Sequence, residues 1–237
     1  VDPALRIFIN EAVCEGCGDC GVKSSCMSVQ PVDTEMGRKT QIHQSSCNKD
    51  YSCLAGDCPA FVEVIPDPNA TRKPTVPFAP IGVDDVPEPA NRIDVGDVLM
   101  MGIGGTGVVT VNQLLATAAL LDGKQAHGLD QTGLSQKGGS VISNLKIRRV
   151  GDGEGAADPL NEGIAEGMAN KVASGEADAY LVFDVLSGVS PVNLDKASPE
   201  RTVAVVSSSK VPTGAMVRDT SAHFPDWAAI QGTIDAV

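Results

Sequence analysis

The pattern of apolar and polar positions divides the chain into two unequal parts. In the first part, strand patterns cover 6–9 and 61–65, and residues 29–44 follow the pattern of a hairpin with its turn near Gly37. Two loops that hold all of the cysteines lie between these elements. Because so small a unit buries little apolar surface, we expect a bound metal to stabilise it.

The second part follows the pattern of an α/β fold. A short apolar strand at 98–101 leads into a glycine loop and then a helix, in which Val108, Val111, Leu115 and Ala118 recur at helical spacing and are expected to face a sheet. Gly123 is expected to end this helix. Further on, the pattern predicts a loop at 130–139, strands at 141–147, 179–185 and 202–206, and a helix at about 162–174. Apolar strands that alternate with helices predict a mostly parallel sheet.

A proline-rich stretch separates the two parts. Prolines at 66, 68, 74, 77, 80, 87 and 89 exclude regular structure and favour an extended connection. We therefore predict a small domain at 1–66, a linker at 67–92 and a larger domain at 93–237. Because the chain starts with Val1 rather than Met and ends on Val237 without an obvious closing element, we expect it to be a fragment of a longer polypeptide.

The charge and the cysteine count narrow the classes of function. A formal net charge of −12 over 237 residues disfavours binding to nucleic acid and to anionic membrane surfaces. No apolar run approaches the length that spans a bilayer. An odd count of seven cysteines fits disulfide pairing poorly. It predicts a reducing compartment, hence the cytoplasm.

Three cysteines stand at a spacing typical of iron–sulfur proteins. Cys14, Cys17 and Cys20 form a C-x2-C-x2-C loop, which lets three thiolates bind one centre while a fourth comes from elsewhere, often from a cysteine that precedes proline. Cys58, followed by Pro59, is the natural fourth ligand. The sequence therefore predicts one 4Fe–4S cluster in a small ferredoxin-like domain.

The other three cysteines, Cys26, Cys47 and Cys53, leave two alternatives open. They could hold a second cluster, which would need an additional ligand, or they could be structural thiols packed beside the first cluster. Zinc is the rival metal, but zinc sites usually pair two C-x2-C knuckles, which the tight loop fits poorly. His43 could complete a zinc site, although a lone histidine in a hairpin is more often solvated.

Two glycine-rich loops in the larger domain are candidate binding sites. Gly102, Gly104, Gly105 and Gly107 lie between a strand and a helix, the context of a dinucleotide loop. The acidic residue that such a site needs is uncertain, since Asp122 comes early and Asp130 late. We therefore favour glycines that serve tight packing, with a cofactor phosphate as the alternative. In the second loop, at 133–139, Gln136 and Lys137 are candidate ligand contacts.

Both the cysteine region and the glycine loops resemble a known family. Met-Gly-Ile-Gly-Gly-Thr-Gly-Val at 101–108 and Gly-Leu-Ser-Gln-Lys-Gly-Gly-Ser-Val at 133–141 are similar to the gamma-type domain of 2-oxoacid:ferredoxin oxidoreductases. The wording of these motifs is closest to the indolepyruvate type. The cysteine region at 14–58 resembles the iron–sulfur part of the long fused form of that enzyme.

The resemblance implies a Rossmann-like gamma-type domain and an activity. Enzymes of this family oxidatively decarboxylate a 2-oxoacid, here an aryl one, to an acyl-CoA and pass the electrons to ferredoxin. Thiamine diphosphate carries the carbanion chemistry, iron–sulfur clusters carry the electrons, and the enzyme is usually a homodimer.

One departure limits what this chain does alone. The family's thiamine diphosphate motif is a Gly-Asp-Gly followed by a distant Asn, and we interpret the Gly-Asp-Gly at 151–153 as a coincidence because no strand precedes it. The diphosphate site is therefore expected outside the chain, which alone should be catalytically inert. The alternative function is a ferredoxin-type module fused to an NAD- or flavin-binding electron-transfer domain.

Overall fold

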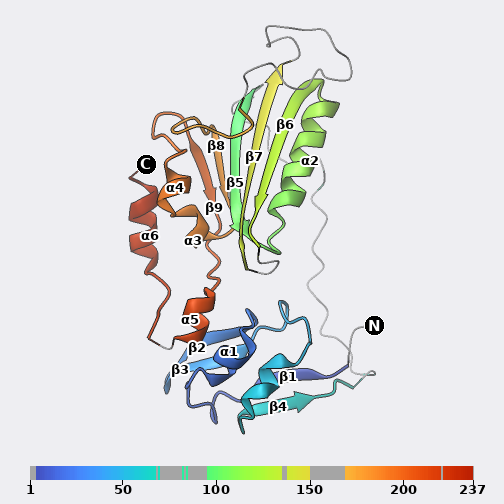
Figure 1. Cartoon of the computed structure of the whole chain (residues 1–237), viewed down its shortest axis with the longest axis vertical. Coiled ribbons are helices and arrows are strands. Elements are labelled where there is room, and N and C mark those ends of the chain that lie inside the picture. The colour runs from blue at the N-terminus through green and yellow to red at the C-terminus, as the bar shows by residue number, and fades with distance from the viewer. Residues whose placement is uncertain are drawn as a thin grey trace. The chain divides into compact units, whose positions relative to one another are not determined.

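Contacts between residues divide the chain into two compact units. The fold is known from a computed structural model, which describes residues 4–67, 69, 82, 84, 95–134, 138–149, 169–219 and 221–236. The first unit takes 1–92 together with 212–223, and the second takes 93–211 together with 224–237. Figure 1 shows the elements of both units. Nearly all of the predicted linker lies outside the described residues.

The first unit contains two antiparallel pairs of strands, which follow the predicted pattern closely. Strand β1 (Arg6–Ile9) pairs with β4 (Phe61–Val64), and β2 (Val29–Thr34) pairs with β3 (Gly37–Ile42). The hairpin turns immediately before Gly37, whose φ of +88° suits glycine. Two short helices follow the two cysteine loops: α1 (Asp19–Ser24) and the 3-10 helix η1 (Ser52–Gly56).

A segment far along the chain completes this unit. Helix α5 (Gly214–Arg218) contacts α1 and β2, and Val217 joins the small core with Ile7, Val29, Ile42 and Cys53. Arg38 donates to the carbonyl oxygens of Asp219 and Ala222, at 3.3 and 2.9 Å, and to that of Met216. The sequence assigned 212–223 to the larger domain because these contacts are long-range and leave no local signal.

The second unit is a five-stranded sheet in the order β6-β7-β5-β8-β9. Its strands are β5 (Gly96–Ile103), β6 (Lys124–Thr132), β7 (Ser140–Arg149), β8 (Ala179–Val182) and β9 (Val203–Val206). Strand β7 runs antiparallel to both β5 and β6, whereas β5, β8 and β9 pair in parallel. All strands except β7 therefore point the same way, which confirms the predicted α/β class with a mostly parallel sheet.

Helices accompany both sides of this sheet. Helix α2 (Val108–Leu121) lies beside β6 in Figure 1, and α3 (Val185–Gly188) and α4 (Pro191–Leu194) lie near β8 and β9. Two clusters of buried side chains result, one around Met100 and Leu145 and the other around Met101 and Tyr180. Helix α6 (Trp227–Ile234) ends the described chain.

The buried stripe of α2 differs from the predicted one. Val108 is buried as expected, but Leu115 is 37% exposed and Ala118 is exposed, while Asn112 and Ala119 are buried instead. The cause is polar: the Asn112 amide donates to Asp130 on β6 at 2.8 Å, which turns the helix towards that strand. Gly123, with φ of +72°, follows the helix as predicted.

Two further expectations are corrected. The predicted loop at 130–139 begins later, because β6 continues to Thr132 and pairs there with Val141 of β7. The predicted helix at 162–174 is not helical over 169–174, where Val172 is buried and its amide donates to Asn144 at 3.0 Å. The rest of that helix, and Gly151-Asp152-Gly153, lie outside the described residues.

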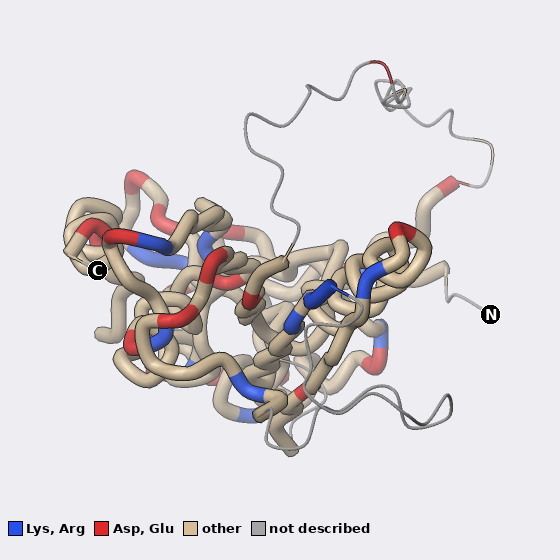
Figure 2. Tube along the Cα trace, turned by 90° about the horizontal axis from the view of Figure 1, so that it is seen from above, with Lys and Arg blue, Asp and Glu red and all other residues tan. Residues whose placement is uncertain are grey.

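Two general features bear on partners. Among the described residues, no helix is both long and apolar enough to cross a membrane. Basic residues are spread along the described trace among the acidic ones rather than gathered in one stretch (Figure 2).

Candidate metal centre

Two of the four predicted cluster ligands, Cys14 and Cys17, lie on the loop between β1 and α1, and a third, Cys20, lies in the first turn of α1. Gly16 and Gly18 have φ of +72° and +80°, values that glycine adopts at little cost. A Cβ on Gly16 would stand well under 3.0 Å from the carbonyl oxygen of Arg38, so the loop crosses closely over β3. The glycines therefore bend the loop tightly around its thiols.

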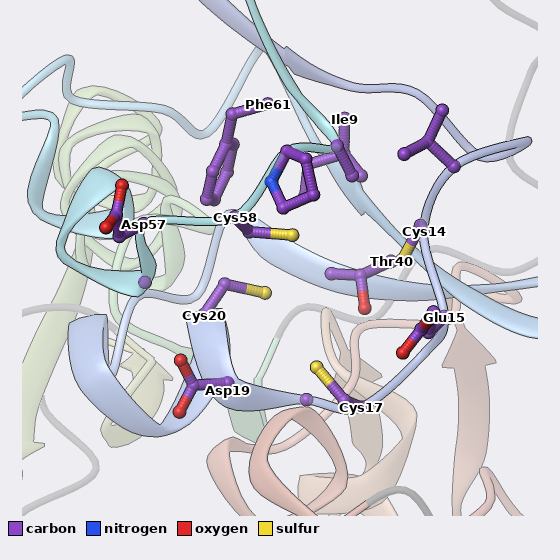
Figure 3. A pocket seen from close by; sticks show the side chains of 15 residues that line it. Ile9, Cys14, Glu15, Cys17, Asp19, Cys20, Thr40, Asp57, Cys58 and Phe61 are labelled. Atoms are coloured by element: carbon purple, nitrogen blue, oxygen red, sulfur yellow. The ribbon is translucent and has the colours of Figure 1, made fainter.

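The fourth predicted ligand, Cys58, reaches the same place from the other half of the unit. Asp57, which precedes it, has φ of +46° and turns the chain after η1. The side chains of the four cysteines point into one cavity of about 400 Å³ (Figure 3). Its wall is partly apolar, with Ile9 and Phe61 among the lining side chains. The structure thus brings the four predicted ligands together, and their binding of metal stays a prediction.

The surroundings of one of these thiols, Cys20, disfavour its thiolate form. Burial raises the pKa of Cys20 to about 11, against a hydrogen bond from the Gly21 amide, and the nearby Cys14 and Cys17 add to the rise. Ligand thiols must lose their protons to bind a metal. A positively charged centre in the cavity would offset the cost of burial, so its binding is expected to release protons.

The chemistry of the donor set, four thiols around one cavity, is that of an iron–sulfur site. Among the described residues, no three His, Cys, Asp or Glu side chains converge on a point where one metal ion could be held. Zinc needs such convergence, since its four ligands surround one atom at about 2.3 Å for sulfur. In a 4Fe–4S cube each thiolate binds a different iron. Four sulfurs arranged around a cavity, rather than around a point, are compatible with that geometry.

The remaining cysteines form a second group in the same unit. Cys53 is buried in the core, and Cys26 and Cys47 pack against that core. Burial raises the pKa of Cys53, and Cys26 and Cys47 add to the rise. All seven cysteines are free thiols. His43 is exposed and hydrogen-bonded to Ser46 at 2.9 Å, as expected of a solvated histidine.

The glycine loop of the second unit has structural uses for its glycines. A Cβ on Gly102 would stand within 3.0 Å of side chains of Thr106, Val108 and Phe183, so this glycine allows strand and helix to pack closely. Gly105 and Gly107 have φ of +99° and +85°. The Gly104 amide donates to Gly139 at 2.8 Å, so that donor is not directed at a phosphate.

The topology around this loop differs from a dinucleotide site. In such a site the acidic residue that binds the ribose ends the strand after the first helix, next to the first strand. Here that strand is β6, and β7 lies between it and β5. Asp130 on β6 accepts hydrogen bonds from Asn112 and Ser143, and Asp122 pairs with Lys124. The other candidate contacts, Gln136 and Lys137, lie outside the described residues.

Comparison with known proteins gives a family match over most of the second unit. Residues 97–225 match the family described as pyruvate ferredoxin/flavodoxin oxidoreductase, which is more than half of the chain. The chain belongs to this family. A solved structure similar to it is the pyruvate oxidoreductase subunit PORC of Thermotoga maritima, at 17% identity and a TM-score of 0.37, covering 60% of this chain and 57% of that one. The chain thus spans little more than half the length of that subunit. No curated protein matches the chain.

Membership of the pyruvate ferredoxin/flavodoxin oxidoreductase family rests on residues that cover most of the second unit and the segment 212–223 of the first. The matched residues begin at Asp97 on β5 and include both glycine loops, but they exclude every cysteine. The ligand assignment at 14–58 therefore depends on spacing and geometry alone. The sequence did not single out Thr40 and Phe61, which line the cavity, because neither belongs to a cysteine loop.

Proposed function

We propose that this chain is the electron-transfer and gamma-type part of a 2-oxoacid:ferredoxin oxidoreductase of the indolepyruvate type. The observation that carries the proposal is the cavity in which Cys14, Cys17, Cys20 and Cys58 meet, in a chain that also holds a family-matched domain. The complete enzyme would convert an aryl 2-oxoacid and CoA into an acyl-CoA and carbon dioxide. Two electrons would pass to ferredoxin, one at a time.

The residues of this chain have a limited part in that reaction. The four thiolates would hold a 4Fe–4S cluster, whose iron accepts and returns single electrons. Ile9 and Phe61 line the cavity, where apolar side chains would limit the access of water to a bound cluster and so tune its potential. The thiamine diphosphate and the carbanion chemistry belong to parts of the enzyme outside this chain, so we expect the chain alone to be inactive towards the oxoacid.

The setting of the enzyme follows from the same proposal. A centre that depends on free thiols is suited to a reducing cytoplasm, and we expect the complete enzyme to work as a homodimer. A net charge of −12 makes nucleic acid an improbable partner. The competing function, a ferredoxin-type module fused to a domain that binds NAD or flavin, requires the chain by itself to bind a dinucleotide at the glycine loop.

The test is metal analysis of the full chain after anaerobic purification and reconstitution with ferrous iron and sulfide. We expect at least about four iron and four sulfide per chain and an EPR signal after dithionite reduction. Cys17→Ser should lower the iron of this site and change its signal, whereas the control His43→Ala should change neither. Zinc without sulfide would overturn the proposal. Saturable binding of NAD or flavin by the chain would favour the competing function.

A further inference from the structure

The two cysteine loops of the first unit are copies of one backbone design. In the first loop the Gly16 amide donates to the sulfur of Cys14 at 3.4 Å, and in the second the Lys49 amide donates to the sulfur of Cys47 at the same distance. In both loops the donor is the second residue after the cysteine. Gly16 and Lys49 also share positive φ, of +72° and +60°.

The correspondence continues along both loops. The fourth residue after the first cysteine has positive φ in each copy, Gly18 at +80° and Tyr51 at +59°. A short helix follows, α1 in one copy and η1 in the other. Each helix ends on a non-glycine residue of positive φ, Ser25 at +48° and Asp57 at +46°. The next residue is a cysteine in both cases, Cys26 and Cys58.

Superposing the copies residue by residue places an aspartate where the first loop has its middle ligand. Cys14, Cys17 and Cys20 correspond to Cys47, Asp50 and Cys53, with two residues between successive members in each loop. The first set is completed by Cys58, which belongs to the second copy. The same exchange in reverse would complete the second set with Cys26, from the first copy.

Packing brings the cysteines of the second set together without reference to the repeat. Cys53 is buried in the core of the first unit, and Cys26 and Cys47 pack against the same core. Helix α1 contacts η1, and the Cys20 backbone lies 3.5 Å from where a Cβ on Gly56 would be. The contact joins the two copies closely enough for each to reach the other's loop.

We propose that Cys26, Cys47, Asp50 and Cys53 bind a second iron–sulfur cluster, in which the Asp50 carboxylate is the ligand of one iron. The proposal rests on the proposed function, since it assumes an iron–sulfur protein. It supplies the additional ligand that the three remaining cysteines need. Asp50 is exposed, so its carboxylate is accessible to an iron at the edge of the group.

Asp50 also has a structural use, which the test must separate from ligation. Its carboxylate accepts hydrogen bonds from the backbone amide and hydroxyl of Ser52, at 3.1 and 2.9 Å, and from the side-chain amide of Asn48 at 3.0 Å. These contacts cap the turn before η1. An asparagine at this position would keep a carbonyl acceptor for the turn but would be a far weaker ligand for iron.

A carboxylate ligand gives the second cluster a distinct chemistry. Thiolates are soft ligands suited to iron–sulfur clusters, whereas carboxylates suit harder ions, so the iron at Asp50 is the one least firmly held. One-electron oxidation of a 4Fe–4S cluster in its 2+ state can then release this iron as Fe²⁺ and leave a 3Fe–4S cluster in its 1+ state. The electron passes to the oxidant, and the carboxylate is left free.

The experiment uses the full reconstituted chain and ferricyanide, a one-electron oxidant. We expect about eight iron per chain before oxidation, release of about one Fe²⁺ per chain, and an oxidised 3Fe–4S signal in EPR. Asp50→Cys should reduce both the released iron and the signal about tenfold, because all four irons then have thiolate ligands. Asp50→Asn should lack the labile iron from the start, with about seven iron per chain.

The control is Asp33→Asn, an exposed aspartate on β2, which should behave as the parent chain. If Asp50→Cys or Asp50→Asn releases iron as the parent does, Asp50 is only a turn residue and the inference is wrong. About four iron per chain with none released would refute the second site and leave the proposed function standing. A chain that takes up no iron would refute the proposed function itself.

Discussion

Replacing Gly16 by alanine tests whether the first cysteine loop is held as tightly as its geometry indicates. Gly16 has φ of +72°, and an added Cβ would stand well under 3.0 Å from the Arg38 carbonyl oxygen. Left-handed backbone costs a non-glycine residue about 1–2 kcal/mol. Since the obstacle is backbone on β3, relieving the contact must move the loop or the strand, at about 1–3 kcal/mol by analogy with overpacking. The expected loss is therefore about 2–5 kcal/mol.

The matched control is Gly37→Ala in the hairpin turn. Gly37 has φ of +88° and no atom within 4 Å of an added Cβ, so only the backbone cost applies. The two variants should differ by about 1–3 kcal/mol, which isolates the close approach to Arg38. Whole domains are stable by only about 5–15 kcal/mol, so Gly16→Ala should also impair iron uptake.

Amide hydrogen exchange of the β2–β3 hairpin measures these losses locally. The free energy of opening at the hairpin should fall more in Gly16→Ala than in Gly37→Ala, while amides of β5 in the second unit serve as an internal reference. Equal losses in the two variants would show that the backbone around the Arg38 carbonyl moves aside at little cost in free energy. The loop would then be held by its bound metal rather than by the protein backbone.

Two further predictions concern the second unit. Asp97 is almost fully buried with Lys146 at 3.2 Å and Arg148 at 2.5 Å, so Asp97→Asn should lower the free energy of unfolding by about 3–5 kcal/mol, measured by urea titration of Trp227 fluorescence. The exposed Asp122, changed to Asn, should cost much less, and equal losses would refute the argument. Hydrogen bonds from Arg201 lower the pKa of Asp178 from 3.8, so their stabilisation is present above that pH and is lost as the pH falls through the lowered pKa. The stability gap between Arg201→Gln and the parent chain should therefore shrink below pH 3.8, and a gap that stays constant with pH would contradict this.

The parts of the fold that were predictable are those set by local pattern. The hairpin around Gly37 appears as predicted because its two strands are near in sequence. The strand at 6–9 appears as predicted because its pattern is clearly apolar, although its partner β4 is distant in sequence. The grouping of Cys14, Cys17, Cys20 and Cys58 follows from spacing and from the cysteine–proline pair, both of which are also local.

The parts that were missed depend on partners far along the chain. Strand β6 is polar over most of its length, and pairing with β7 rather than hydrophobic burial makes it a strand. The buried stripe of α2 is set by Asn112, whose side-chain amide donates to Asp130 on the neighbouring strand β6. Helix α5 joins the first unit through Val217 and the carbonyl groups that Arg38 binds, about 180 residues away in sequence.

The repeat of the cysteine loops is not visible in the sequence, because the two loops differ in residue type at matching positions. The first loop has glycine at both positions of positive φ, whereas the second has Lys49 and Tyr51 there, so the shared conformation leaves no shared residue type. The residue at the middle position also differs, Cys17 in the first loop and Asp50 in the second. The regular spacing of Cys47, Asp50 and Cys53 was the one signal available, and a search restricted to cysteines does not detect it.

The proposed exchange of ligands between the two copies has a consequence for folding. In the two proposed clusters Cys58 completes the first set and Cys26 the second, so neither loop would hold a full donor set until α1 packs against η1. The core of the first unit is small: Ile7, Val29, Ile42, Val217 and Cys53 are buried, and Cys20, Cys26 and Cys47 are among the side chains packed against them. A core of this size gains little from burial alone. Because a preformed site does not exist in the unfolded chain, the free energy of metal binding becomes free energy of folding. We therefore expect the same thiols to hold the clusters through which electrons pass. By binding metal, they would also supply the stability that the small apolar core lacks.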